Sequence, residues 1–303
     1  MSTAKRVVIL GPTASGKSDV AMAAATQWGN VHIVAADAIQ VYRRMNIGSA
    51  KPTEHDQSLV PHHGIDVCEP SERYTVARFM DDIAIARTTI AAAGAHELIV
   101  GGTGLYVTAL VDGLSMPGEW PEIRAQLEAN EDTAALFAQL KSLDAQATEK
   151  MEPNNRRRII RALEVCLGSG EKFSSFGEGV AQFPETSTKQ IGIKWNRDSL
   201  RARIAERVRR MVAAGLAEEV RALLAEPLGI SATARQGLGY KEFIEYIEGR
   251  WTQEEAVNAT ILRTQQFAVR QERWYRRDPR IHWVEVQTDP IAEVTPVLLS
   301  ALA

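Results

Sequence analysis

Apolar runs alternate with amphipathic stretches through the first hundred residues of the chain. Residues 6–10 (RVVIL) and 97–100 (ELIV) end at glycine, and residues 31–35 (VHIVA) end just before Asp37, which predicts three buried parallel strands. Between them the pattern predicts helices over 17–28 and from Thr75 to about Ala93. Strands and helices in this alternation are typical of a doubly wound parallel sheet, so we expect an α/β fold.

The pattern changes after residue 113. Residues 113–195 are helix-rich and carry breakers, and the Gly/Ser/Thr-rich stretch 168–188 predicts a mobile loop. A returning strand at 190–195, long helices at about 198–224, 240–248 and 253–276, a strand at 281–286 and a terminal helix are expected to follow. We therefore expect an α/β core that begins with residues 1–114, a mostly α-helical insertion domain at 115–189, and a mostly helical return to the core at 190–303.

Composition narrows the class of protein. With 303 residues and 45% hydrophobic side chains, the chain can build its core without covalent cross-links. Two cysteines, Cys68 and Cys166, are too few for a disulfide scaffold or a Cys-rich zinc module. No apolar run reaches the ~18 residues of a membrane span, and the N-terminus lacks a signal-peptide pattern. We expect a cytoplasmic protein with no membrane contact.

Arginines are concentrated in three short windows, although the net charge is only −3. The windows are residues 155–161, 197–210 and 263–280, with four, six and six arginines. Charge alone favours two interpretations equally: ordinary helix surface, or local patches for a nucleic acid.

A phosphate-binding loop follows the first predicted strand. The residues GPTASGKS fit G-x-x-x-x-G-K-[ST] and open the first helix, so the expected phosphate ligands are Gly11, Pro12, Thr13, Ala14, Ser15, Gly16, Lys17 and Ser18. Backbone N–H groups and the helix N-terminus favour an anion, Lys17 adds a positive charge, and the Ser18 hydroxyl can ligate Mg²⁺. The motif predicts a P-loop NTPase-like parallel sheet core. Asp37 is interpreted as a general base or metal ligand, or as a cap of the following segment.

Further blocks resemble the tRNA dimethylallyltransferases, the tRNA isopentenyltransferase (IPP transferase) family. GPTASGKS is that family's form of the loop. The other similar blocks are DAIQVYRRMNIGSAKP at 37–52, PHHGID at 61–66, GGTGLY at 101–106, NNRRRIIRALEV at 154–165, QGLGYKE at 236–242 and TQQFAVRQ at 264–271. Three residues depart from the family pattern: Ala38 replaces the usual serine, and Gln265 and Val269 replace arginine and lysine.

The resemblance implies transfer of a dimethylallyl group from dimethylallyl diphosphate to N6 of the adenosine directly 3′ of the anticodon, with release of diphosphate. It implies that the loop holds the leaving diphosphate with Mg²⁺ on Ser18, and that Arg221 adds to this clamp. Asp37 matches the family's catalytic aspartate, and Thr103 matches a residue near the reacting adenine. Alternatively, Thr103 is a helix N-cap and Arg221 a surface arginine.

The resemblance also implies contacts with the tRNA anticodon stem-loop, from which the adenine must be flipped out. The residues expected to contact tRNA are Asp37, Ala38, Ile39, Gln40, Thr103, Arg124, Arg157, Arg158, Arg161, Gln236, Gly239, Tyr240 and Lys241. We expect a monomer that needs no protein partner. Two alternatives use the same loop differently: an ATP-dependent small-molecule or nucleotide kinase, and a non-catalytic RNA-binding protein.

Overall fold

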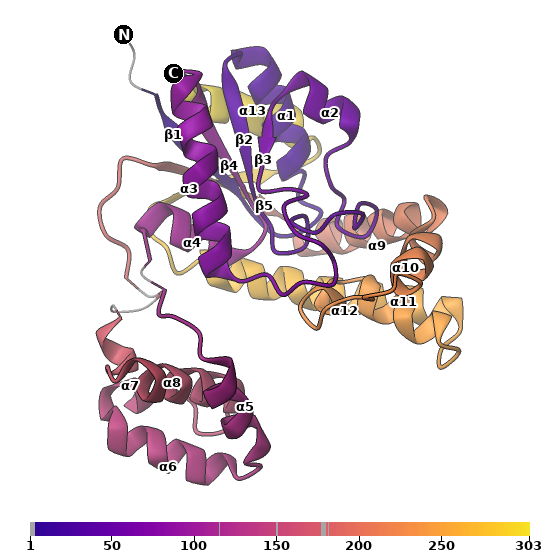
Figure 1. Cartoon of the computed structure of the whole chain (residues 1–303). Coiled ribbons are helices and arrows are strands. Elements are labelled where there is room, and N and C mark those ends of the chain that lie inside the picture. Colours follow the sequence, from indigo (N-terminus) through magenta and orange to yellow (C-terminus); the bar gives the residue numbers. More distant parts are fainter. Residues whose placement is uncertain (1–3, 115, 150, 177–179, 181) are drawn as a thin grey trace. The chain divides into compact units, whose positions relative to one another are not determined.

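The computed structural model describes residues 4–114, 116–149, 151–176, 180 and 182–303. The chain forms two compact units, which are shown in Figure 1. One unit combines the segment up to residue 111 with residues 185–303, and the other comprises residues 112–184. The Gly/Ser/Thr-rich stretch predicted as a loop contains a short 3₁₀ helix, Phe173–Ser175, and its residues 177–179 and 181 lie outside the described residues.

A parallel sheet forms the centre of the first unit, as the sequence predicts, and it has six strands. Its strands are β1 (Arg6–Leu10), β2 (Val31–Ala36), β3 (His62–His63), β4 (His96–Gly101), β5 (Lys189–Trp195) and β6 (Ile281–Val286). They lie in the order β3-β2-β4-β1-β5-β6. The sequence did not predict β3, because two residues are too few to carry a hydrophobic period.

The central strands are buried on both faces. Along β1, Val8 and Leu10 face one hydrophobic cluster, and Val7 and Ile9 face the other. This alternation explains why the strand is a continuous apolar run and not a polar–apolar repeat.

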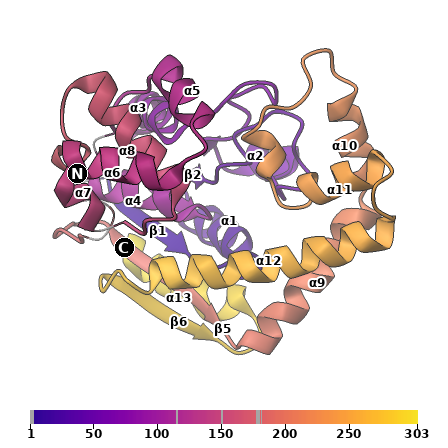
Figure 2. The same ribbon diagram turned by 90° about the horizontal axis from the view of Figure 1, so that it is seen from below.

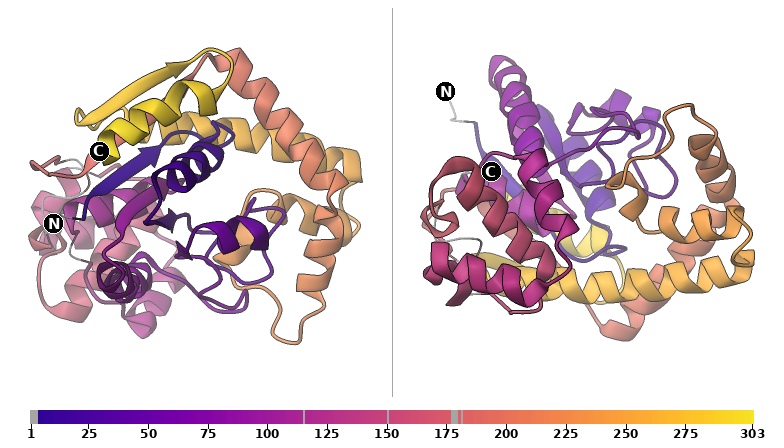
Figure 3. Two further views of the ribbon diagram at one scale, coloured as in Figure 1. Left: turned by 90° about the horizontal axis from the view of Figure 1, so that it is seen from above. Right: turned by 60° about the horizontal axis from the view of Figure 1, so that its bottom comes forward.

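Helices cover both faces of the sheet. One cluster is built with α3 (Val76–Ala92), α4 (Gly104–Asp112), α10 (Leu216–Leu224) and α11 (Tyr240–Ile247). The other is built with α1 (Lys17–Trp28) and α13 (Pro290–Leu302), which lie side by side in the left view of Figure 3. A short helix, α2 (Glu54–Leu59), precedes β3 and was also not predicted.

The expected helix over 198–224 is two helices. The first, α9 (Arg197–Ala213), ends before Gly215, whose φ of 99° lies in the left-handed region, and α10 then begins at Leu216. Glycine adopts this conformation without the strain of a Cβ, so the chain turns here. The long helix α12 (Gln253–Tyr275) packs against α9, as Figure 2 shows.

The second unit is helical. It contains α5 (Pro121–Ala129), α6 (Thr133–Leu143), α7 (Ala145–Glu149) and α8 (Arg156–Ser169). The apolar face of α8 packs Ile159 and Leu163 against Leu136 and Leu140 of α6. The unit therefore has a core of its own. None of the helices in the described part of the chain is long and apolar enough to cross a membrane.

Candidate active site

Three loops that carry the predicted chemistry meet at one edge of the sheet. The phosphate loop follows β1, Asp37 follows β2, and Gly102 and Thr103 follow β4. Since β2, β4 and β1 are adjacent and parallel, their carboxyl ends lie together. Ligands of open α/β sheets bind at this edge.

The phosphate loop is held in shape by contacts from other elements. Arg203 Nε on α9 donates to Ala14 O at 2.9 Å, and Trp195 Nε1 on β5 donates to Ser15 O at 3.0 Å. Gly16 has a φ of 93°, and a Cβ there would lie 2.6 Å from Pro290 Cγ. Lys17 Nζ donates to Pro12 O at 2.8 Å. These contacts fix the loop in front of the N-terminus of α1.

A cleft of about 1060 Å³ opens beside this loop. Lys17 and Ser18 line it from α1, and Arg203, Arg207 and Arg210 line it from α9. The three arginines occupy one face of α9 because their spacings are four and three residues. The sequence showed this arginine window but did not indicate which arginines would reach the phosphate loop.

The electrostatics of the cleft centre on Lys17, Arg207 and Asp37. Burial, together with the charge of Arg207, lowers the pKa of Lys17 to about 7, and the Asp37 carboxylate opposes this shift. Burial also lowers the pKa of Arg207, again opposed by Asp37. Within the described residues, Arg207 makes no hydrogen bond or ion pair. A partly buried cationic pair of this kind favours a multiply charged anion.

Asp37 and Thr103 form the second half of the site. Asp37 Oδ1 accepts hydrogen bonds from Ile39 N at 2.9 Å and Gln40 N at 3.3 Å. Asp37 therefore does cap a turn, but its Oδ2 has no hydrogen bond within the described part of the chain. Thr103 Oγ1 accepts from Ala38 N at 3.0 Å, so its hydroxyl links the two loops, and Thr103 O accepts from Val107 N at 3.1 Å at the start of α4. Because the donor to Thr103 Oγ1 is the main-chain N–H of residue 38, this bond forms with alanine there in place of the family's usual serine.

Arg221, which was expected to add to the phosphate clamp, lies outside the lining of this cleft. It lies on α10 with its side chain 55% exposed, 3.7 Å from Glu218, and is not among the residues that line the cleft. Arg207, on α9, does line the cleft.

Two residues expected to contact tRNA have buried side chains with internal partners. Gln40 Nε2 donates to Ser49 O at 3.2 Å and Ala50 O at 3.1 Å. Tyr240 is fully buried, and its hydroxyl donates to Glu219 Oε1 at 2.7 Å. Gln40 therefore holds the backbone at Ser49 and Ala50, and Tyr240 holds the Glu219 carboxylate. Of their expected neighbours, Ile39 is partly buried, Gly239 is buried, and Gln236 and Lys241 are exposed.

The four arginines of the helical unit that were expected to contact tRNA divide into two groups. Arg124 and Arg161 lie 3.4 Å and 3.1 Å from the buried carboxylate of Glu164, so both stabilise the unit from within. Arg157 and Arg158 are exposed, and their side chains have no hydrogen bond or ion pair within the described residues. Among these four, the side chains of Arg157 and Arg158 are therefore the more accessible.

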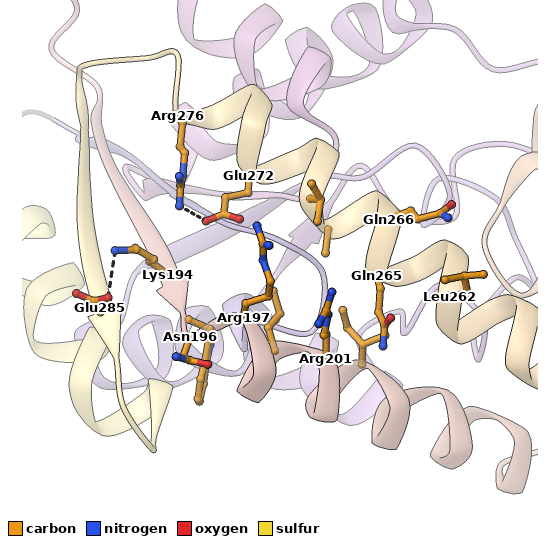
Figure 4. Close-up of a pocket in the computed structure, with 15 residues that line it drawn as sticks. Lys194, Asn196, Arg197, Arg201, Leu262, Gln265, Gln266, Glu272, Arg276 and Glu285 are labelled. Atoms are coloured by element: carbon orange, nitrogen blue, oxygen red, sulfur yellow. Dashed lines mark hydrogen bonds and ion pairs between the residues drawn. The ribbon is translucent and has the colours of Figure 1, made fainter.

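A second cavity, of about 360 Å³, lies between α9, α12 and the last two strands (Figure 4). Two ion pairs lie among its lining residues: Lys194–Glu285 (3.1 Å) and Arg276–Glu272 (2.5 Å). Gln265 lines this cavity, as does Val269. Gln265 and Val269, where the family usually has arginine and lysine, therefore lie outside the lining of the cleft beside the phosphate loop.

A divalent metal fits the cleft beside the phosphate loop only together with a phosphate ligand. The exposed Ser18 hydroxyl and the Asp19 carboxylate line the cleft, but the described residues hold no cluster of three or more His, Cys, Asp or Glu ligands. Mg²⁺ commonly takes one or two protein oxygens and completes its shell with water and substrate phosphates.

Comparisons of the sequence and the fold with known proteins point to one family. Models of IPP transferase and isopentenyl transferase match residues 40–278 and 4–60. The chain is 42% identical to a tRNA dimethylallyltransferase from Kineococcus radiotolerans, over 97% of this chain and 98% of the relative, and 42% identical to one from Thermobifida fusca, over 92% and 89%. A solved structure of the Bacillus halodurans tRNA isopentenylpyrophosphate transferase has a TM-score of 0.70 at 34% identity, and the match covers 98% of this chain and 96% of that one. A eukaryotic dimethylallyltransferase acting on tRNA shares the fold, with a TM-score of 0.81 at 22% identity, over 98% of this chain and 78% of that one. The chain belongs to the IPP transferase family.

Proposed function

We propose that this protein transfers a dimethylallyl group from dimethylallyl diphosphate to N6 of the adenosine directly 3′ of the anticodon in tRNA, releasing diphosphate. The observation that carries the proposal is that the phosphate loop, which follows β1, and Asp37, which follows β2, lie at the same edge of one parallel sheet. A group that leaves as an anion and a group that accepts a proton thus lie in one site. The family relationship supports the same reaction.

The donor side is built to stabilise the leaving group. As the allylic C–O bond breaks, negative charge gathers on the departing diphosphate. The loop N–H groups, Lys17 and Arg207 meet that charge where water is partly excluded, which makes each interaction stronger. Bound Mg²⁺, with Ser18 as its protein ligand, would neutralise further charge on the diphosphate.

On the acceptor side, Asp37 is the group that receives a proton. The exocyclic amine of adenine must lose a proton as the C–N bond forms. Asp37 Oδ1 is fixed by two main-chain N–H groups, so Oδ2 remains to orient the amine and accept that proton. Thr103 holds the Asp37 turn in register through Ala38 N.

The tRNA is expected to bind through exposed cationic side chains. Arg157 and Arg158 of the helical unit suit phosphate contacts, and Gln236 and Lys241 offer exposed polar groups on the α/β unit. The adenine must leave its stack, at a cost of a few kcal/mol that site contacts offset.

The test is a product assay. Purified protein is incubated with Mg²⁺, dimethylallyl diphosphate and unmodified tRNA, without ATP, and the digested tRNA is analysed by mass spectrometry. We expect prenylated adenosine from the wild type and a loss of about 10²-fold or more with Asp37→Asn, which keeps the Oδ1 acceptor. Consumption of ATP with no prenylated product would favour a kinase, and tRNA binding with no turnover would favour a non-catalytic RNA-binding protein.

A further inference from the structure

One buried side chain on α12 joins the two halves of the site. Gln271 is only 5% exposed. Its Oε1 accepts a hydrogen bond from Thr13 N at 2.8 Å, and its Nε2 donates to Gly102 O at 2.5 Å. Thr13 belongs to the phosphate loop and Gly102 to the loop after β4. Three segments that are far apart in the sequence thus meet at one amide.

The bridge lies where the sheet no longer holds the two loops together. The pairing of β1 with β4 ends at Leu10 and Gly101. Beyond those residues no strand pairing joins the phosphate loop, on the donor side, to the Gly102–Thr103 loop, which lies against Asp37 on the acceptor side. A rigid link at this point determines how far apart the halves are held.

The loop after β4 is in turn packed against the proposed base. A Cβ built on Gly102 would lie 2.7 Å from Asp37 Oδ2, so the main chain at Gly102 and this oxygen are in close contact. A shift of Gly102 would therefore move the surroundings of Asp37. Gln271 couples this oxygen to the backbone that holds the donor diphosphate.

We propose that Gln271 is a positioning residue that sets the alignment of the donor carbon with the acceptor amine. The inference rests on the proposed function. An amide is required because the two partners are of opposite kind: Thr13 N needs an acceptor and Gly102 O needs a donor. Glutamate has the same shape but, when ionised, has no proton to donate to Gly102 O.

The rest of α12 is anchored independently of this bridge. Trp274 packs against Gly104, and Tyr275 donates from its hydroxyl to Gly101 O at 3.4 Å. Substitutions at Gln271 should therefore leave the helix in place and change mainly the spacing of the loops.

The experiment compares Gln271→Glu, Gln271→Leu and a matched control, Gln266→Glu, which adds the same charge at an exposed position of α12. We measure kcat, the KM values for dimethylallyl diphosphate and tRNA, and the Kd for inorganic diphosphate, from about pH 5.5 to 8. The kcat of each variant is divided by the wild-type kcat at the same pH, so that any pH dependence common to all the proteins cancels.

We expect Gln271→Glu at about pH 8 to lower kcat roughly 10–100-fold, because misalignment by about 1 Å costs this much, with Kd and both KM values changed by less than about threefold. Its relative kcat should recover as the pH falls, because burial raises the pKa of a carboxyl group and the protonated form donates to Gly102 O again. Gln271→Leu should lose kcat equally at every pH, and Gln266→Glu should match the wild type.

A Gln271→Glu enzyme with wild-type kcat at all pH values, or with a loss that is independent of pH, would overturn the inference. This comparison remains decisive even if Gln271→Leu does not fold. A wild-type protein that forms no prenylated tRNA would instead overturn the proposed function on which the inference rests.

Discussion

Adding one methyl group beside Asp37 tests whether the position of this carboxylate limits turnover. In Gly102→Ala the new Cβ would lie 2.7 Å from Asp37 Oδ2, against an ordinary contact of at least 3.4 Å, so the two groups must separate by about 0.7 Å. Asp37 Oδ1 is held by Ile39 N and Gln40 N, so the carboxylate can relieve the contact only by rotating or by straining that turn.

The expected cost follows from these distances. Overpacking of this size destabilises a fold by roughly 1–3 kcal/mol, which this fold should survive. Displacement of a reacting group by about this distance lowers kcat roughly 10–100-fold, or about 1.4–2.7 kcal/mol of transition-state stabilisation. The Kd for diphosphate should stay within about twofold, since Gly102 does not line the donor cleft.

The assay is single-turnover prenylation at saturating donor, alongside thermal unfolding. Gly94→Ala is the matched control: Gly94 has a φ of 60° and open space around its Cβ, so alanine costs stability, by about 1–2 kcal/mol, without touching the site. Gly102→Ala with a kcat within about twofold of the control would refute the argument that Asp37 is tightly constrained.

Further substitutions and a pH series test the donor cleft and the helical unit. Arg207→Gln should weaken diphosphate binding roughly 10–100-fold in titration calorimetry, whereas Arg221→Gln should leave it unchanged. Equal effects of the two substitutions would show that Arg221 also contributes to diphosphate binding. Because the pKa of Lys17 is lowered to about 7, Lys17 loses its positive charge as the pH rises through this value, and diphosphate affinity should fall. Below this pH Lys17 is already protonated, so binding should need no proton uptake by Lys17. A diphosphate affinity that stays constant up to about pH 9 would contradict this titration of Lys17. Arg158→Ala should raise the KM for tRNA, reduce the slope of log affinity for tRNA against log salt concentration by about 1, and leave thermal stability unchanged. Arg161→Ala should instead lower the melting temperature. The reverse pattern would make Arg161 the phosphate contact and Arg158 the structural residue.

Local pattern predicted most of the sheet because buried parallel strands need continuous apolar runs. The strands expected at 6–10, 31–35, 97–100, 190–195 and 281–286 all form, with ends within about two residues. The pattern missed β3, which has only two residues, and it merged α9 with α10 because helical periodicity continues across Gly215. Pairing with β2, not an apolar run, makes residues 62 and 63 a strand.

For the site, the sequence by itself determined the groups that local backbone geometry positions. Gly16 and Lys17 follow from the loop motif, and Asp37 follows from its place at the end of a strand, since parallel strands bring their carboxyl ends to one edge. These assignments depend only on neighbours in sequence and on the α/β pattern.

Tertiary structure alone decided which arginines are available to a ligand. The sequence showed arginine-rich windows, but the availability of each arginine depends on what packs against its guanidinium group. Arg161 forms an ion pair with Glu164, whereas Arg207 lines the cleft and has no ion pair among the described residues. The bridge from Gln271 to Thr13 and Gly102 likewise depends on how α12 packs against the sheet edge. Hydrogen bonds between residues 258 and 169 positions apart leave no local signal in a sequence, because they arise only when the packed core brings those segments together.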